Sequence, residues 1–163
     1  VVSPLHILDA PNDLVALPPA GLVDIQSGRW QGDEIIRRIQ DVQRRYDSVV
    51  AVEDNGAQAF LLQWAGSQSI PIHAFTTRAS NKFDEAFGVE SLAVEFRAGL
   101  WVVPSGAAGA DIPPECRQWL SECQAYSPDR HAGDRLMASW MARETARSAM
   151  RGVTQGNVDT QRR

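Results

Sequence analysis

The feature that most constrains the fold of this chain is an apolar stretch, residues 49–52, that ends abruptly in Glu53, Asp54, Asn55 and Gly56. An apolar run without polar alternation is typical of a strand covered on both faces, as in a parallel or mixed sheet flanked by helices. Helical periodicity lies on both sides of this run, which favours a central position for the strand. Ligands of open α/β sheets bind beyond the carboxyl ends of such strands, where Glu53 and Asp54 would emerge.

The rest of the chain alternates between strand-like and helix-like segments. Residues 33–46 form the clearest amphipathic helix, because Ile35, Ile39 and Val42 recur at helical spacing while arginines fill the other face. We expect further strands at residues 5–8, 22–25, 71–77 and 101–103. We expect further helices through residues 60–66, 89–98, 113–123 and 133–150, with loops at 78–87 and 105–111. Residues 151–163 lack apolar periodicity and are expected to be disordered, which assigns residues 1–150 to one domain.

The composition is that of an ordinary globular protein. The chain has 163 residues, enough for one well-buried core, and 44% of them are hydrophobic. It contains no apolar run of transmembrane length and no signal-peptide pattern. Its net charge of -4 argues against a general attraction to nucleic acid, but it is compatible with a local basic rim around an acidic metal site.

Cys116 and Cys123 are the only cysteines, and both fall in one expected helix. At that spacing their Cα atoms would lie about 10 Å apart, which is too far for a disulfide. Two cysteines without a neighbouring histidine pattern do not form a zinc site either. We therefore expect reduced core thiols and a cytoplasmic location.

Glu53 is the first candidate for a catalytic and metal-binding residue. A carboxylate that closes a buried strand must be paired, protonated or bound to a cation, because an isolated buried charge is strongly unfavourable. The alternative is an exposed turn residue, with Asp54 or Asn55 capping the next helix.

Asp134 is the second candidate. Its alternative is an acid in a first helical turn, where the helix dipole favours negative charge. At helical spacing, however, it shares a face with Met137, Ala138 and Met141, the side expected to press on the sheet. A strand-end glutamate and an inward helix aspartate such as Glu53 and Asp134 form half of a two-metal carboxylate site. Mg²⁺ or Mn²⁺ prefers such oxygen ligands, and two ions about 4 Å apart can hold both the attacking and the leaving oxygens of a phosphodiester.

Four further residues are candidates for supporting roles. Asp54 is a candidate accessory ligand, and His131 would act as an outer-shell group or general acid/base, although a partly exposed histidine at a helix start has the same signature. Arg78 and Lys82 lie in a polar, basic loop that either contacts DNA phosphate or is simply solvated. The chain has no phosphate-binding loop of the G-x-x-x-x-G-K-[ST] type, no Gly-x-Ser-x-Gly elbow and no His-Glu-x-x-His motif.

Several short motifs follow one another along the chain. They are Gly28-Arg29-Trp30, residues 34–39, residues 52–58, Thr76-Thr77, Asn81-Lys82, residues 87–93, residues 101–104 and residues 131–140. In this combination and order they resemble the nuclease domain of tailed-phage terminase large subunits. The resemblance extends over almost all of the chain up to about Arg147.

This resemblance implies a ribonuclease-H-like fold, an α/β architecture with a mixed five-stranded sheet flanked by helices on both faces. It implies a site for two divalent ions, Mg²⁺ or Mn²⁺, with Glu53 as a strand-borne ligand and Asp134 as the helix-borne acid. The implied activity is the cutting of concatemeric double-stranded DNA during genome packaging, at the procapsid in the host cytoplasm. The implied partners are double-stranded DNA, the portal protein, the small terminase subunit and an ATPase domain of the same polypeptide, with no membrane.

The chain departs from the family pattern at two places. The family's first catalytic aspartate lies on an opening strand upstream of residues 5–8, and a chain that begins with Val1 is expected to start too late to include it. Asp9 and Asp24 are poor substitutes, since each follows a strand equated with the second or third of the family. Leu100 stands where a lysine is expected. We therefore expect an N-terminally truncated nuclease domain with impaired activity on its own.

Two other functions compete with this one. The chain would be another ribonuclease-H-like nuclease, such as a resolvase, if it prefers branched DNA. It would be a non-catalytic remnant that docks on a partner, such as a portal ring, if loss of Glu53 or Asp134 leaves its function intact.

Overall fold

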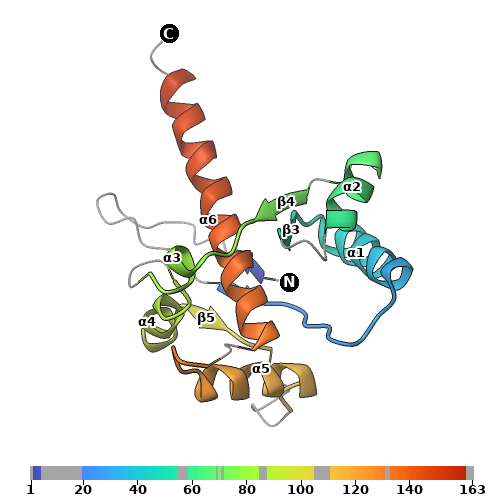
Figure 1. Cartoon of the computed structure of the whole chain (residues 1–163). Coiled ribbons are helices and arrows are strands. Elements are labelled where there is room, and N and C mark those ends of the chain that lie inside the picture. The colour runs from blue at the N-terminus through green and yellow to red at the C-terminus, as the bar shows by residue number, and fades with distance from the viewer. Residues whose placement is uncertain are drawn as a thin grey trace. The chain divides into compact units, whose positions relative to one another are not determined.

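The computed structural model describes residues 2–4, 20–54, 59–68, 70, 72–84, 88–104, 111–130 and 133–160, and it confirms the α/β class (Figure 1). The chain divides into two compact units. The first unit comprises residues 1–28 and 78–140, and the second comprises residues 29–77 and 141–163.

The first unit contains a three-stranded mixed sheet. Strands β1 (Val2–Pro4) and β2 (Ala20–Leu22) pair antiparallel, and β5 (Trp101–Val102) pairs parallel with β2, so the strand order is β1-β2-β5. The helices of this unit are α3 (Ala79–Lys82), α4 (Ser91–Arg97), α5 (Pro114–Ala125) and the first part of α6 (Asp134–Thr160).

The core of the first unit forms where α5 packs against the sheet. Leu22 from β2 and Cys116 and Trp119 from α5 are buried together, with Phe96 and Trp101 packed against them. Helix α5 begins with a proline at its first turn, where the missing N–H has no helical partner to lose. These contacts place the aromatic residues of α4, β5 and α5 in one cluster.

The second unit is built on a parallel strand pair. Helix α1 (Gly32–Tyr46) leads into β3 (Val50–Glu53), and α2 (Ala59–Gln68) then connects β3 to β4 (Ile72–Phe75). The two strands pair in register from Val50 opposite Ile72 to Glu53 opposite Phe75. Parallel strands need a crossover connection, and α2 supplies the helix for it. Acidic residues in the first turn of α1 and arginines in its last turn complement the helix dipole.

Most of the expected elements are confirmed, with shifts of a few residues at their ends. These are the helices at 33–46, 60–66, 89–98, 113–123 and 133–150 and the strands at 49–53, 71–77 and 101–103. Within the described part of the chain β3 pairs with β4 alone, so a central position for β3 is not confirmed. The strand expected at residues 5–8 and most of the loop at 105–111 lie outside the described residues.

Two local expectations are wrong. A strand is expected at residues 22–25, but the strand found there, β2, ends at Leu22. Beyond its end, the Asp24 carboxylate accepts a hydrogen bond from Gln26 Nε2 at 3.2 Å. Such local side-chain bonds compete with strand pairing. The loop expected at 78–87 contains α3, where Asn81 Oδ1 accepts the Arg78 backbone N–H at 2.8 Å. Apolar periodicity cannot reveal a turn made by polar side chains.

The predicted disordered tail, residues 151–163, is helical as far as Thr160, because α6 continues past Met150. No proline interrupts this segment, and each residue added to an existing helix gains a backbone hydrogen bond without a new nucleation cost. Although α6 has 27 residues, neither it nor another helix in the described ranges combines the length and apolarity needed to cross a membrane.

Candidate metal-binding acids and their surroundings

Glu53 lies at the carboxyl end of the β3–β4 pair, as its sequence position predicts. It is the last residue of β3 and stands opposite Phe75, the last residue of β4. The pairing continues one step further, because the Asp54 amide donates to the Phe75 carbonyl at 2.8 Å. The Glu53 side chain is half-buried, whereas Asp54 is exposed. Both acids therefore leave the sheet at the edge where ligands of parallel strands bind.

The oxygen donors at this edge are of the kind that a hard divalent cation prefers. Glu53 and Asp54 supply carboxylates, and Thr77 follows the end of β4 by two residues. The Oγ1 atom of Thr77 is buried without a hydrogen-bond partner among the described residues. Thr77 belongs to one of the short motifs named above, but the sequence assigns it no role as an oxygen donor. No three His, Cys, Asp or Glu side chains form a metal cluster within the described ranges.

Asp134 is the first residue of α6 in the first unit, and its side chain is exposed. The expectation that it faces inward is wrong. The buried face of this helix runs through Leu136, Trp140 and Arg143, while Ala138, one turn after Asp134, is exposed. Asp134 therefore lies at the margin of the buried face. Its candidate neighbour His131 lies outside the described residues.

The two acids belong to different units, Glu53 to the second and Asp134 to the first. Each is described within its own unit, so their roles as shared metal ligands stay predictions.

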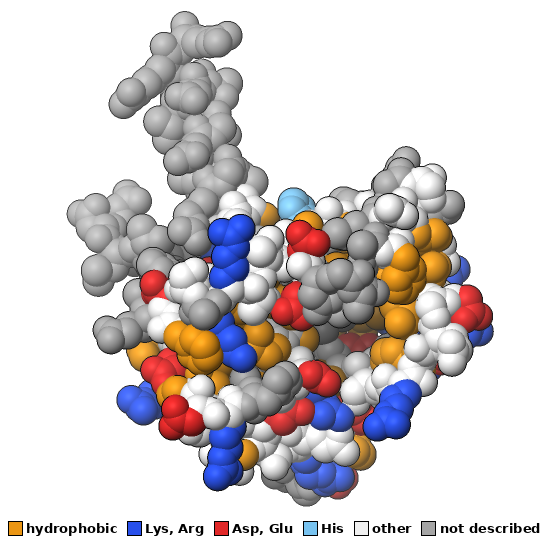
Figure 2. Space-filling view, in the orientation of Figure 1, with side chains coloured by type: hydrophobic (Ala, Val, Ile, Leu, Met, Phe, Trp, Pro, Cys, Tyr) orange, Lys and Arg blue, Asp and Glu red, His pale blue; other side chains and the backbone are white. Residues whose placement is uncertain are grey.

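The basic candidates, Arg78 and Lys82, flank α3 in the first unit. Arg78 is exposed, and its carbonyl accepts the amides of Asn81 and Lys82 at 3.1 and 2.9 Å. The Lys82 ammonium stands 5.4 Å from the centre of the Phe83 ring, a cation–π distance. Figure 2 shows Lys and Arg side chains interspersed with acidic and uncharged ones on the face in view.

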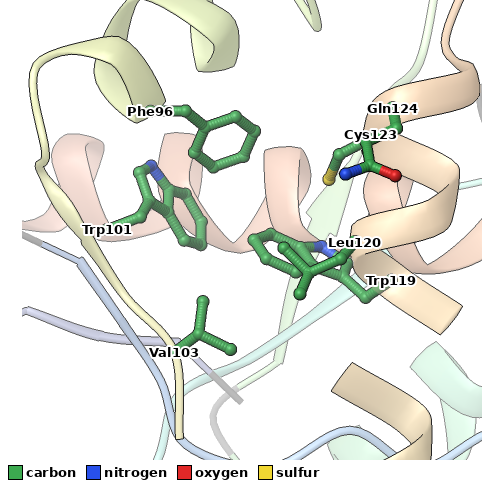
Figure 3. Close-up of a pocket in the computed structure, with 7 residues that line it drawn as sticks. All are labelled: Phe96, Trp101, Val103, Trp119, Leu120, Cys123 and Gln124. Carbon is green, nitrogen blue, oxygen red and sulfur yellow. The ribbon is translucent and has the colours of Figure 1, made fainter. Parts of the chain in front are cut away.

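A cavity of about 350 Å³ opens beside the aromatic cluster of the first unit (Figure 3). Its lining residues are Phe96, Trp101, Val103, Trp119, Leu120, Cys123 and Gln124. Both indole N–H groups are used elsewhere, because Trp101 Nε1 donates to Glu95 and Trp119 Nε1 donates to Ser139, each at 2.9 Å. The cavity is thus apolar apart from the Gln124 amide and the Cys123 thiol, and its walls carry no charged side chain.

Cys123 is expected to react slowly with iodoacetamide in the folded chain. Burial first, and the nearby Glu122 carboxylate second, raise the pKa of its thiol from 9.0 to about 12. At about pH 8 its thiolate fraction should be about a thousandfold below that of an unperturbed thiol. The raised pKa favours the neutral thiol in the folded state, so this group's contribution to stability is present below pH 9 and declines as the pH rises toward 12.

Mass spectrometry after alkylation of the folded chain and of the urea-unfolded chain measures this difference. The expected reduced state fits the structure, in which Cys116 and Cys123 are both free. Burial also raises the pKa of Cys116, so both thiols should label only after unfolding. Rapid labelling of Cys123 in the folded chain would contradict the expectation.

Comparisons with protein-family models, with curated proteins and with solved structures find no match to this chain.

Proposed function

We propose that this chain is the nuclease domain of a phage terminase large subunit, a metal-dependent endonuclease that cuts concatemeric double-stranded DNA during genome packaging. The observation that carries the proposal is the position of Glu53, a half-buried carboxylate at the carboxyl end of a parallel strand pair. The ordered series of motifs around it supports the same reading, as does the α/β class of the chain. The finer fold that we propose is ribonuclease-H-like.

The chemistry proposed is hydrolysis of a phosphodiester. Glu53 and Asp134 would hold two Mg²⁺ or Mn²⁺ ions, with Asp54 and the Thr77 hydroxyl as accessory oxygen donors. When bound, such ions activate water and neutralise the charge that develops on the phosphate. Arg78 and Lys82 would contact the DNA backbone and so position the duplex without reading its sequence. His131 would transfer a proton as a general acid or base.

The proposal also assigns partners and a location. Double-stranded DNA is the substrate, an ATPase domain of the same polypeptide drives translocation, and the portal protein and the small terminase subunit are the assembly partners. DNA cleavage and packaging take place in the host cytoplasm at the procapsid.

The test is metal-dependent cleavage of supercoiled plasmid by the natural polypeptide that carries this chain. We expect nicking and linearisation with Mn²⁺ or Mg²⁺, and complete loss of cleavage after chelation with EDTA. Agarose gels of the plasmid forms measure the rate. Cleavage that persists in EDTA would contradict the metal mechanism, and a strong preference for a four-way DNA junction over a linear duplex would favour a resolvase instead.

A further inference from the structure

The two indole rings that line the cavity of the first unit are held in fixed positions. Trp101 Nε1 donates to Glu95 Oε2 and Trp119 Nε1 donates to Ser139 Oγ, each at 2.9 Å. Both acceptors belong to buried side chains, with 7% of Glu95 and 5% of Ser139 exposed. A ring tethered at its polar edge cannot turn into the neighbouring space without losing that buried hydrogen bond. The cavity is therefore preformed.

The aromatic rings at the cavity also brace one another. Phe96 meets the ring of Trp101 edge-on at 5.3 Å and 71°, and it meets the ring of Trp119 at 5.5 Å and 87°. The two indole rings lie 5.7 Å apart and are tilted by 33°. Edge-to-face geometry of this kind is favoured for aromatic pairs. Figure 3 shows these side chains around the cavity, and they come from α4, β5 and α5, so three separate elements supply one aromatic wall.

The cavity offers water few hydrogen-bond partners. Apart from the two indoles, whose N–H groups already have acceptors, the described lining residues supply only the Gln124 amide and the weakly bonding Cys123 thiol. A buried water needs about two to four hydrogen bonds to be held well. An apolar group that displaces poorly held water gains affinity. The volume of about 350 Å³ also lies within the range of about 300–1,000 Å³ for small-molecule sites, so an apolar ligand is the better filling.

We propose that this cavity binds an uncharged, planar aromatic molecule of two or three fused rings. The aromatic wall and the Cys123 sulfur favour such a ligand, because ring–ring and sulfur–ring contacts add to simple burial. None of the described lining residues is charged, so a carboxylate or phosphate on the ligand would enter without a partner. The Gln124 amide, exposed on α5 at the cavity wall, matches a single polar group at the edge of the ligand. The site is independent of the metal chemistry proposed above.

The experiment is a calorimetric titration of the full chain with 2-naphthol, an uncharged bicyclic aromatic molecule with one hydroxyl. For a ligand of this size we expect a dissociation constant of about 100 µM. The indole N–H NMR signals of Trp101 and Trp119 should shift on binding, whereas those of Trp30 and Trp64 in the second unit should not. Naphthalene-2-sulfonate should bind about tenfold more weakly, because its charge finds no partner. Decahydro-2-naphthol, the saturated analogue, should bind about fivefold more weakly, because it makes no ring–ring contacts.

Two variants locate the ligand within the cavity. Val103→Phe adds a ring at the cavity wall and should weaken 2-naphthol binding about tenfold, because it fills space that the ligand needs. The matched control is Val94→Phe, the same substitution on α4 at a residue that is 64% exposed, and it should bind 2-naphthol as the wild type does.

Gln124→Ala tests the polar contact. It should weaken 2-naphthol binding about fivefold and leave the binding of 2-methylnaphthalene unchanged, because only 2-naphthol has a hydroxyl that loses a partner. Gln124 is exposed, so this variant should fold normally. Should Val103→Phe lose its far-ultraviolet circular dichroism, Gln124→Ala decides the question with the same two ligands.

Three outcomes overturn the inference. Absence of binding heat and of shifts for Trp101 and Trp119 at about 1 mM 2-naphthol, about ten times the expected dissociation constant, would mean that the cavity takes no such ligand. Wild-type affinity in Val103→Phe, or in Gln124→Ala if Val103→Phe does not fold, would place the binding outside the cavity. Equal affinity for 2-naphthol and its charged and saturated analogues would refute the aromatic class. Each of these outcomes leaves the nuclease proposal standing, because plasmid cleavage tests that separately.

Discussion

Glu53→Gln is expected to abolish metal-dependent DNA cleavage while leaving the fold intact. Glutamine has the same size and shape as glutamate, so the half-buried position at the end of β3 can accept it without a cavity. The amide, however, removes the negative charge that a divalent cation requires of this ligand. A metal-held phosphoryl centre supplies several kcal/mol of charge stabilisation, so we expect the rate to fall by about a thousandfold. Initial rates of plasmid nicking in Mn²⁺ by the natural polypeptide that carries this chain, with and without the substitution, measure the loss.

The matched control is Asp47→Asn in the same unit. Asp47 is exposed at the end of α1 and has a φ of 46°, a left-handed conformation that asparagine also adopts readily. This variant makes the same change of charge without touching the carboxyl end of β3, and it should cleave at the wild-type rate. Wild-type cleavage by Glu53→Gln would remove Glu53 from the metal site and favour the docking function over the enzymatic one.

The parts of the fold that the sequence predicts are those with a strong apolar period. Helix α1 is found within a residue of its expected start, because its isoleucines recur at helical spacing and its end charges match the helix dipole. Strand β3 is found at Val50–Glu53 because an apolar run that stops at a carboxylate marks both the strand and its end. The position of Glu53 at a ligand-binding edge follows from the same pattern.

The arrangement around Asp134 was not predictable in this way. Helical spacing puts Asp134 on the same face as Met137, and Met137 is indeed buried. The same spacing does not show that the buried face of α6 also runs through Leu136 and Trp140, which leaves Asp134 at its margin. Glu122 of α5 accepts the backbone N–H groups of Arg135 and Leu136 at the start of α6, and this contact has no local signal either, since Glu122 lies on another helix and the residue directly before α6 is a glycine. Gly133 was the one available hint, because a glycine before a helix permits close approach of another group.

Trp119→Ala is expected to destabilise the first unit by about 3–5 kcal/mol, the range for truncating a buried large aromatic residue. Only 1% of Trp119 is exposed, and its ring meets Phe96 edge-on at 5.5 Å and lies 5.7 Å from the ring of Trp101. Truncation also leaves the buried Ser139 hydroxyl without the indole N–H that now donates to it. Urea denaturation followed by circular dichroism measures the change in the free energy of unfolding.

Two further variants separate the contributions to this loss. Trp119→Phe keeps an aromatic ring and removes the hydrogen bond to Ser139, whose hydroxyl still donates to the Arg135 carbonyl. It should therefore cost about 1–3 kcal/mol, from the lost hydrogen bond and the smaller ring. Val94→Ala, on α4 with 64% of its surface exposed, should change stability by less than about 0.5 kcal/mol. A loss for Trp119→Ala as small as that for Val94→Ala would mean that the aromatic cluster does not hold α5 on the sheet. The cavity beside Trp119 would then be loosely packed space at the surface of the unit. The start of α6, whose first amides donate to Glu122 of α5, would lose its rigid support.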